Sequence, residues 1–590
     1  MNEVIDFARK RPVLAALFLI APLTVLFGIL IPDKPRIVEW FHATGFVSIF
    51  AAFLLWLGSL PWEFFERTRL VAFARRHAVP ALLALGITVS AFLSSPPTFR
   101  ILADETNLMG TASAMYDEHA FYNPTQRTHY YEGMQNTISR EWDKRPLFFP
   151  FMVYLAHSFL GYRETNGFVV NAICSFFLLF SFYLLLNRFF TRFLSVLGMI
   201  ILAAFPLLVL WMTSWSFEIP NLLFGVLAFL SFERLTRTGS AKDAETLVFT
   251  LILLAQIRYE SVLFLVVLFP VGAYFLKREE VGALSWRILL VPMLLLPSVW
   301  QRMVSFNQGA FQMTNGKSPF SFEWFGPNLQ YAWNFFTAER VAYGTIPLVF
   351  YCSFVGLFAA VWWYISNRKE WTARAWLIPG SAITVFGLNA AILFGYYWGN
   401  LTLQYAMRLG LIFVPFMIAS CVFLLDCITD RGRQARVWLI VGVCSLPIWY
   451  WSSAGANEAV REILIFREFT AVRRFLDYSF PRKDVVVISD LSNLYIPFRW
   501  SAVGNAYANA SVNDLLTNLK NGLFQNFITV QRIGYADGKP SLGTFLDPKF
   551  ELETLYETQY SAEEMLRISR VKHQGERAKE PASLTVPFGK

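Results

Sequence analysis

The chain has 590 residues, of which 55% are hydrophobic and 16% are charged, and its mean hydropathy is +0.43. This composition excludes a soluble globular protein and is typical of a protein built into a membrane. The net charge of +9 does not indicate a nucleic-acid partner, because the Lys and Arg residues lie mainly in short loops between apolar runs. The five cysteines match neither a disulfide framework nor a zinc-site spacing.

Apolar runs predict a polytopic α-helical membrane protein with about thirteen transmembrane helices. The first run follows a basic cluster and is too long for the core of a signal peptide, so we expect an uncleaved first span. The predicted spans are Val13–Ile31, Gly45–Leu60, Pro80–Leu93, Phe168–Leu186, Phe193–Met212, Phe217–Phe232, Thr246–Ile257, Ser261–Phe275, Ile288–Trp300, Thr345–Ile365, Trp376–Tyr396, Leu409–Leu425 and Val437–Trp451.

The basic loops between these runs predict the orientation, since positively charged residues stay on the cytoplasmic side. The N-terminus is then cytoplasmic, and the polar stretch Ser94–Arg145 lies outside. The shorter run Leu147–Leu160 is expected to lie at the membrane interface, because a crossing there would put Arg188 and Arg192 outside. An odd number of spans places the segment after Ser452 outside as well.

The pattern divides the chain into three parts. We expect two extra N-terminal transmembrane helices in residues 1–79 and a transmembrane core in residues 80–453, with its first outer loop at 94–146. Residues 454–590 have the composition of a soluble domain, expected on the non-cytoplasmic (periplasmic) side of a multi-pass protein of the cell inner (plasma) membrane.

The C-terminal part reads as a small α/β domain. Asp484–Asp490 is a candidate for a buried strand, and helix candidates lie around Asn457–Asp477 and at Val512–Leu519. Turn signals separate them, as in a compact soluble fold.

Two adjacent carboxylates, Asp104 and Glu105, stand at the start of the first outer loop. Carboxylates at a membrane edge are costly unless they are solvated or used. After them Leu108, Ala112 and Met115 recur at helical spacing, which predicts an amphipathic helix lying along the membrane. A solvated loop start, with acidic residues favoured near a helix N-terminus, is the alternative interpretation of the pair.

The succession of motifs in this loop resembles a known superfamily. The Asp-Glu pair and its helix ending in Ala-x-x-Met are followed by Lys144-Arg145-Pro146-Leu147 before an apolar stretch, and by Gly161-Tyr162-Arg163-Glu164 before the next span. This order resembles the C-type (GT-C) glycosyltransferases, in particular the protein O-mannosyltransferases and lipid A aminoarabinose transferases. The resemblance runs from about Pro80 to the C-terminus and implies the GT-C fold.

The chain departs from the family pattern at two places. The family usually shows two prolines where this chain has Arg145-Pro146, and a Lys is common where this chain has Arg258-Tyr259-Glu260. These departures bear on the identity of the donor more than on the reaction.

The resemblance implies an inverting glycosyltransferase that moves a hexose or pentose from a polyprenyl-phosphate carrier to a glycolipid, glycan or protein acceptor on the non-cytoplasmic face. Polyprenyl phosphate leaves as a stable anion, so the main need is a base for the acceptor hydroxyl, and the resemblance assigns that role to Asp104. Glu105 completes the expected catalytic pair. Because adjacent helical residues point about 100° apart, Glu105 is expected to bind acceptor, a cation or a neighbouring loop.

Binding the donor phosphate requires positively charged side chains, and arginine suits bidentate phosphate recognition. Arginines at outer ends of spans can also simply anchor at the interface. Arg258 and Arg408 interrupt apolar segments where the family faces its donor, whereas Arg302 is a further candidate. Glu218 either binds acceptor or orients an arginine, or is an ordinary helix N-terminal acid. The expected substrate-binding residues are Arg258, Tyr259, Glu260, Arg408, Glu218, Lys144 and Arg145.

Histidines in and near the first loop raise the question of a metal. His119, His129 and His157 match no standard ligand motif, so we assign no metal ligands. Some relatives bind a divalent cation at this loop, which leaves such a cofactor open.

Two other functions use similar partners. An O-antigen ligase or polymerase also uses polyprenyl-linked sugars but relies on arginines and a histidine in a later outer loop, and the early Asp-Glu loop argues against it. A non-catalytic transporter or flippase of lipid-linked sugars is expected to show ionisable residues in mid-membrane or an inverted repeat, and the sequence shows neither clearly.

Overall fold

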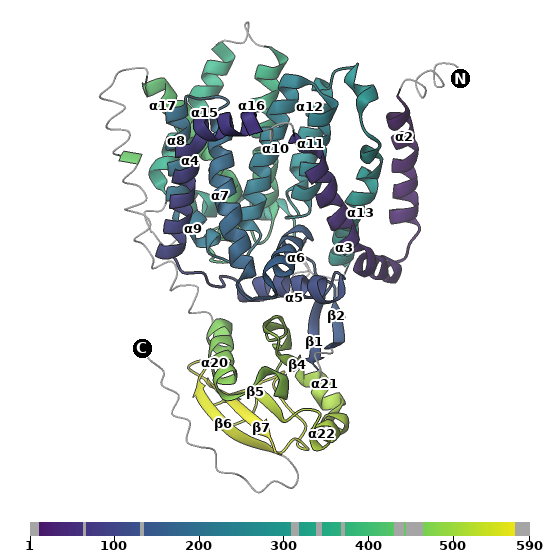
Figure 1. Ribbon diagram of the computed structural model, residues 1–590. Helices are drawn as coiled ribbons and strands as arrows, with labels where there is room; N and C mark the ends of the chain where they lie inside the picture. Colours follow the sequence, from purple (N-terminus) through teal and green to yellow (C-terminus); the bar gives the residue numbers. More distant parts are fainter. Residues whose placement is uncertain are drawn as a thin grey trace. The chain divides into compact units, whose positions relative to one another are not determined.

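The computed structural model describes residues 11–62, 67–129, 135–307, 318–337, 345–366, 372–429, 442–443 and 464–572. The chain forms two compact units. The helical unit comprises Met1–Phe121 and Trp142–Val460, and the sheet unit comprises Tyr122–Glu141 and Arg461–Lys590. Figure 1 labels most of the elements of both units.

The helical unit is built from long apolar helices joined by short turns (Figure 1). Its helices are α2 (Pro12–Val25), α3 (Lys34–Ser59), α4 (Arg67–Ser94), α5 (Leu102–Glu118), α6 (Phe148–Leu160), α7 (Asn166–Leu186), α8 (Arg192–Ala204), α9 (Pro206–Met212), α10 (Glu218–Thr238), α11 (Ala241–Ala255), α12 (Val262–Phe275), α13 (Val291–Asn307), α14 (Phe325–Thr337), α15 (Pro347–Ser366), α16 (Ala373–Gly395) and α17 (Val414–Thr429), the last preceded by the 3₁₀ turn η9 (Met407–Phe413).

Within the described residues, nine helices are long and apolar enough to cross a membrane, or ten if the bent pair α8–α9 is one span. The expected number was about thirteen, and the difference lies partly in α11 and α12. These helices have 15 and 14 residues, so at about 1.5 Å per residue they are shorter than a hydrocarbon core of roughly 30 Å. The expected span Val437–Trp451 lies outside the described residues apart from 442–443.

The expected span Phe193–Met212 is broken rather than straight. The axes of α8 and α9 differ by 72°. Pro206 begins α9, and Phe205 before it has an extended backbone (φ −65°, ψ 115°). The bend follows because proline cannot donate its backbone N–H and disfavours helical geometry in the residue before it.

Helices α15 and α17 approach each other closely at Gly356. A Cβ atom at this position would lie 2.0 Å from the carbonyl oxygen of Ser420, so only glycine fits. Close backbone approach of this kind is how helices pack tightly where surrounding lipid supplies no hydrophobic drive between them.

The sheet unit is a seven-stranded mixed sheet in the order β2-β1-β4-β3-β5-β7-β6. β3 runs parallel to both β4 and β5, and the other neighbours are antiparallel. The strands are β1 (Asn123–His129), β2 (Gln135–Glu141), β3 (Val485–Ile488), β4 (Ser501–Val503), β5 (Asn526–Gly534), β6 (Leu552–Gln559) and β7 (Glu564–Val571), and the helices are α20 (Leu464–Ser479), α21 (Asn505–Ala510) and α22 (Val512–Lys520).

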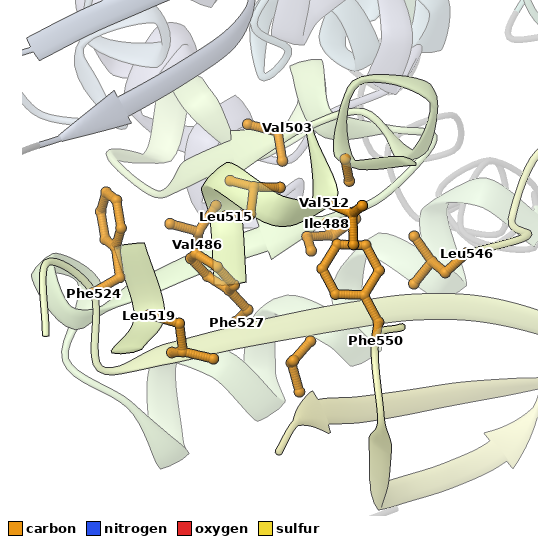
Figure 2. Packing of buried hydrophobic residues seen from close by; sticks show 12 residues of the cluster. Val486, Ile488, Val503, Val512, Leu515, Leu519, Phe524, Phe527, Leu546 and Phe550 are labelled. Carbon is orange, nitrogen blue, oxygen red and sulfur yellow. The ribbon is translucent and has the colours of Figure 1, made fainter. Parts of the chain in front are cut away.

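The core of the sheet unit forms where α22 meets the parallel strands (Figure 2). Leu515 and Leu519, four residues apart on α22, pack with Val486, Phe527 and Phe550. The expected strand at Asp484–Asp490 and helix at Val512–Leu519 are therefore present as β3 and α22. The expected helix around Asn457–Asp477 corresponds to α20, apart from its first residues, which lie outside the described ones.

The β1–β2 hairpin comes from the first outer loop, yet it belongs to this sheet. Arg127 of β1 pairs with Ala502 of β4, and the Ser492 hydroxyl donates to the Thr125 carbonyl oxygen at 2.8 Å. We did not predict these strands, because their residues are mostly polar and carry no run of apolar or β-branched side chains.

Candidate active site

The first turn of α5 separates the two adjacent carboxylates, as expected for neighbouring helical positions. Glu105 is completely buried and accepts hydrogen bonds from three backbone N–H groups. They belong to Arg100, to Ile101 at 3.0 Å and to Trp215 at 3.0 Å. Glu105 therefore joins the start of α5 to the turn between α9 and α10, which is the neighbouring-loop role among those expected for it.

Burial raises the pKa of Glu105 to about 7, although the three N–H donors oppose this shift. The buried Arg100 strengthens the same junction by donating to the Thr213 hydroxyl at 2.9 Å and the Leu210 carbonyl oxygen at 3.3 Å. The hydrogen bonds of Glu105 and Arg100 thus fix the backbone next to Asp104.

Asp104 faces the other way and lies between two arginines. Arg145 donates to one carboxylate oxygen, and Arg408 donates to the other at 2.6 Å. Burial raises the pKa of Asp104, but the charges and hydrogen bonds of both arginines outweigh burial and hold it well below its ordinary value. About 24% of the Asp104 side chain remains exposed, so a substrate can reach it.

A buried carboxylate positions Arg145. Asp143 is 2% exposed and lies 3.3 Å from the Arg145 guanidinium, and it also accepts from the Thr111 hydroxyl of α5 at 2.6 Å. Gln301 of α13 donates to the backbone carbonyl oxygens of Asp143 and Arg145. The segment before α6 is therefore fixed to both α5 and α13.

Glu218, at the start of α10, lies beside Arg258 and Arg408, two of the arginines expected at the donor phosphate. It accepts from Arg258 and lies 3.5 Å from Arg408, and Arg258 also pairs with Glu260 at 2.7 Å. The ring of Phe217 lies 5.4 Å from the Arg258 guanidinium and 5.9 Å from that of Arg408. Both cations are thus held by charge and by an aromatic face. Glu218 therefore contacts two arginines, while acceptor binding by Glu218 stays a prediction.

These side chains line one cavity of about 380 Å³. Arg302 lies in its wall as well and donates to the Tyr259 carbonyl oxygen at 2.6 Å. The charged and aromatic residues that line the cavity are Asp104, Lys144, Arg145, Phe217, Arg258, Tyr259, Glu260, Arg302, Phe320, Tyr396, Trp398, Tyr405, Arg408 and Phe413.

The structure brings together residues separated by some three hundred positions in the sequence. Of the residues expected at the site, Asp104, Lys144, Arg145, Arg258, Tyr259, Glu260 and Arg408 line the cavity, Glu218 lies behind two of its arginines, and Glu105 is buried outside its lining. The sequence analysis missed Asp143 and Phe217, whose roles come from burial against an arginine, and the aromatic residues after α16. A run of Tyr396, Tyr397 and Trp398 was the available signal.

Neither His119 nor His157 lines this cavity. His157 is buried against Asn166 at 2.9 Å, and His119 ends α5 in a left-handed conformation (φ 52°). The side chain of His129 lies outside the described residues. In the part of the chain that the structure describes, no three His, Cys, Asp or Glu side chains are grouped to hold a metal ion.

A second cavity of about 640 Å³, mainly apolar, adjoins the first at Ile412. Along α16, residues 378–386 line the apolar cavity and residues 389–393 line the charged one. Along η9 and α17 the same succession runs in the opposite direction, from 405–413 to 412–427. A ligand with a charged head and a long apolar tail could occupy both.

No protein-family model and no curated protein matches the sequence. Among solved structures, the chain is similar to ArnT from Cupriavidus metallidurans bound to undecaprenyl phosphate, at 11% identity over 85% of this chain and 99% of that chain, with a TM-score of 0.48. It is also similar to the Archaeoglobus fulgidus oligosaccharyltransferase in complex with Zn and sulfate, at 12% identity over 76% of this chain and 67% of that chain, with a TM-score of 0.43. Both matches cover at least three quarters of this chain.

Proposed function

We propose that this membrane protein transfers a sugar from a polyprenyl-phosphate carrier to an acceptor hydroxyl on the non-cytoplasmic face of the membrane. The observation that carries the proposal is the convergence of Asp104 with Arg145, Arg258, Arg302 and Arg408 in one cavity. Four guanidinium groups around a half-buried carboxylate suit a phosphate ester, since arginine binds phosphate through paired N–H donors.

The adjoining apolar cavity suits the polyprenyl tail. It begins at Ile412, four residues after Arg408, and continues along α16 and α17. A lipid whose phosphate meets Arg408 would therefore lay its hydrocarbon against apolar side chains rather than in water. A soluble nucleotide sugar would leave this surface uncovered.

Asp104 would act as the base. The acceptor oxygen attacks the anomeric carbon of the sugar and its proton passes to the Asp104 carboxylate, while the bond from that carbon to the phosphate oxygen breaks. The electron pair leaves with the polyprenyl phosphate, and the configuration at the carbon inverts.

The two arginines make Asp104 a weak base before the donor binds, because they depress its pKa. A donor phosphate would compete for the Arg145 and Arg408 guanidinium groups. As they turn to the phosphate, the pKa of Asp104 rises toward its ordinary value and the carboxylate becomes free for the acceptor. This competition predicts that donor binds before acceptor.

The test is binding and transfer by Arg258→Ala and Arg408→Ala variants of the full chain. A lost charge-assisted contact of about 1.5–3 kcal/mol should weaken undecaprenyl phosphate binding by roughly 10–150-fold. Arg374→Ala is the matched control, because it breaks an Arg–Glu pair of 2.7 Å with the buried Glu233 away from this cavity. Equal lipid-phosphate affinity in all three variants would contradict the proposal. Donor binding without any transferred sugar would indicate a carrier.

A further inference from the structure

A group of exposed aromatic rings lies in the wall of the charged cavity. Phe320, Trp398 and Tyr405 line it and are 44%, 43% and 39% exposed, respectively. The Trp398 and Tyr405 rings are 5.0 Å apart, and Tyr396 stacks against Phe320 at 5.0 Å. Large rings left uncovered inside a cavity offer an apolar face to a ligand. We call Phe320, Tyr396, Trp398 and Tyr405 the aromatic wall.

The position of the aromatic wall follows from the course of α16. This helix meets the apolar cavity at residues 378–386, the charged cavity at 389–393, and then the aromatic residues after it ends at Gly395. In the segment after this loop, Tyr405 comes first and Arg408 second. Both line the charged cavity, and the residues that line the apolar cavity begin at Ile412. The aromatic wall thus lies beyond the arginines when counted from the apolar cavity.

Hydrogen bonds and close packing fix the loop after α16, which carries Tyr396, Trp398 and Tyr405. The buried Asn328 amide of α14 donates to the carbonyl oxygens of Phe394 at 3.0 Å and Tyr396 at 2.7 Å. Ser321 N–H donates to the Gly395 carbonyl oxygen at 2.9 Å, and a Cβ atom at Gly399 would lie 2.1 Å from the Leu393 carbonyl oxygen. A fixed loop keeps its rings exposed, whereas a loose one would let them collapse together.

We propose that the aromatic wall is a sugar subsite, in which Trp398 and Tyr405 stack on the C–H face of a pyranose ring attached to the bound phosphate. This assignment rests on the proposed function. A polyprenyl-phosphate sugar has its tail, phosphate and sugar in that order, and the protein presents an apolar cavity, arginines and aromatic rings in the same order. Lys144 and Glu260 line the same cavity and would offer polar partners to the sugar hydroxyls.

The experiment compares two ligands on each variant of the full chain: undecaprenyl phosphate without sugar, and undecaprenyl-phosphate hexoses with glucose, galactose or mannose. Trp398→Ala and Tyr405→Ala should weaken binding of a hexose-bearing lipid by about tenfold and leave binding of the sugar-free lipid unchanged. Trp398→Phe should retain most of the affinity for the hexose-bearing lipid. Trp362→Ala is the matched control, since Trp362 is 74% exposed on α15 and lies outside both cavities.

Each other outcome overturns the subsite. Equal losses for both lipids would show that Trp398 anchors the loop or the membrane interface, and no loss would show that the rings are not used. If none of the hexose-bearing lipids binds more tightly than the sugar-free lipid, the proposal that this site binds a pyranose is wrong. Arg258→Ala and Arg408→Ala keep the two proposals apart, because they weaken both lipids if the proposed function holds, whatever the aromatic wall does.

Discussion

Asp104 has two arginine partners, and each of these has a second carboxylate of its own. Arg145 also pairs with Asp143, and Arg408 also lies beside Glu218. Removing the Asp104 charge therefore leaves neither guanidinium without a counter-ion. This arrangement permits a test of the base in which folding is largely unaffected.

For Asp104→Asn, transfer should fall by roughly 10²–10⁴-fold because the proton acceptor is lost. Binding of undecaprenyl phosphate should stay equal or tighten, since the two arginines no longer share their hydrogen bonds with a carboxylate. The measurements are turnover at saturating substrates, lipid affinity and the thermal unfolding midpoint. Near-normal turnover would rule out the base role, and a fall in turnover that tracks a lower midpoint would indicate a structural role instead.

Glu105 should behave differently because it is buried at a junction of backbones. A pKa raised to about 7 from its ordinary value near 4.5 means that the folded state holds the proton more tightly than the unfolded state. The stability from this group is fully present below about pH 4.5 and is lost as pH rises through about 7. The unfolding midpoint of the wild type should therefore fall relative to that of Glu105→Gln from pH 5 to 8, whereas Asp104→Asn should keep the wild-type profile. Parallel profiles for all three proteins would contradict the shift.

The residue types at the site could be predicted where chemistry demands them. Asp104, Arg258, Arg408 and Glu218 were all expected at one site, and their side chains lie close together. The separation of Asp104 from Glu105 followed from helix geometry alone. Asp143 could not be predicted, because its role depends on a tertiary contact with Thr111, thirty-two positions away.

Among the elements, the loop after α16 is tightly packed at a glycine. Gly399 packs against the Leu393 carbonyl oxygen and the Asn328 side chain, with Cβ distances of 2.1 Å and 2.6 Å. Neither neighbour can move freely, since the first is backbone and the second is held by two hydrogen bonds. The glycine is required by space rather than by conformation.

Gly399→Ala should therefore displace the loop, at a cost of about 1–3 kcal/mol, and lower sugar transfer more than lipid-phosphate binding. Gly395→Ala is the control on the same segment, because its Cβ would meet nothing within 4 Å. Transfer rates, lipid affinity and unfolding midpoints would be measured for both. Equal effects of the two substitutions would show that the loop does not need its observed shape.

The positions of the membrane helices were predicted better than their lengths and bends. Apolar runs located every described helix that can span a membrane, because burial in lipid demands them. The bend at Pro206 and the short α11 and α12 were not anticipated, since a window average passes over a single proline and over charged helix ends. The β1–β2 hairpin was missed because strand pairing supplies its order and its side chains supply little.

At the scale of the whole molecule, the sheet restricts the membrane topology without reference to charge. β1 and β4 are neighbours in one sheet, so the first outer loop and the C-terminal segment lie on the same side of the membrane. The chain between residues 142 and 463 must then cross an even number of times. The charge pattern, which places this side outside, is a separate prediction.

Both statements can be checked by adding one cysteine at a time to a background in which all five native cysteines are replaced, and labelling intact cells with a membrane-impermeant maleimide. Asn136→Cys and Leu542→Cys are at exposed positions of the sheet unit and should both react. Arg237→Cys, at the expected cytoplasmic end of α10, should react only after permeabilisation. Unlike reactivity at the first two positions would contradict the shared sheet, and protection of both would reverse the orientation.

The shared sheet also imposes a waiting time during biosynthesis. The hairpin ends at residue 141 and its partner strand begins at residue 501, so at roughly 5–20 residues per second the hairpin exists for roughly 20–70 seconds before β4 is made. Through this interval its edge strand is unpaired and exposed to other nascent chains. The polar sequences of β1 and β2 suit that delay, because such strands have little tendency to aggregate. The amino-acid composition of the β1–β2 hairpin therefore suits solubility before the sheet assembles more than it suits strand propensity.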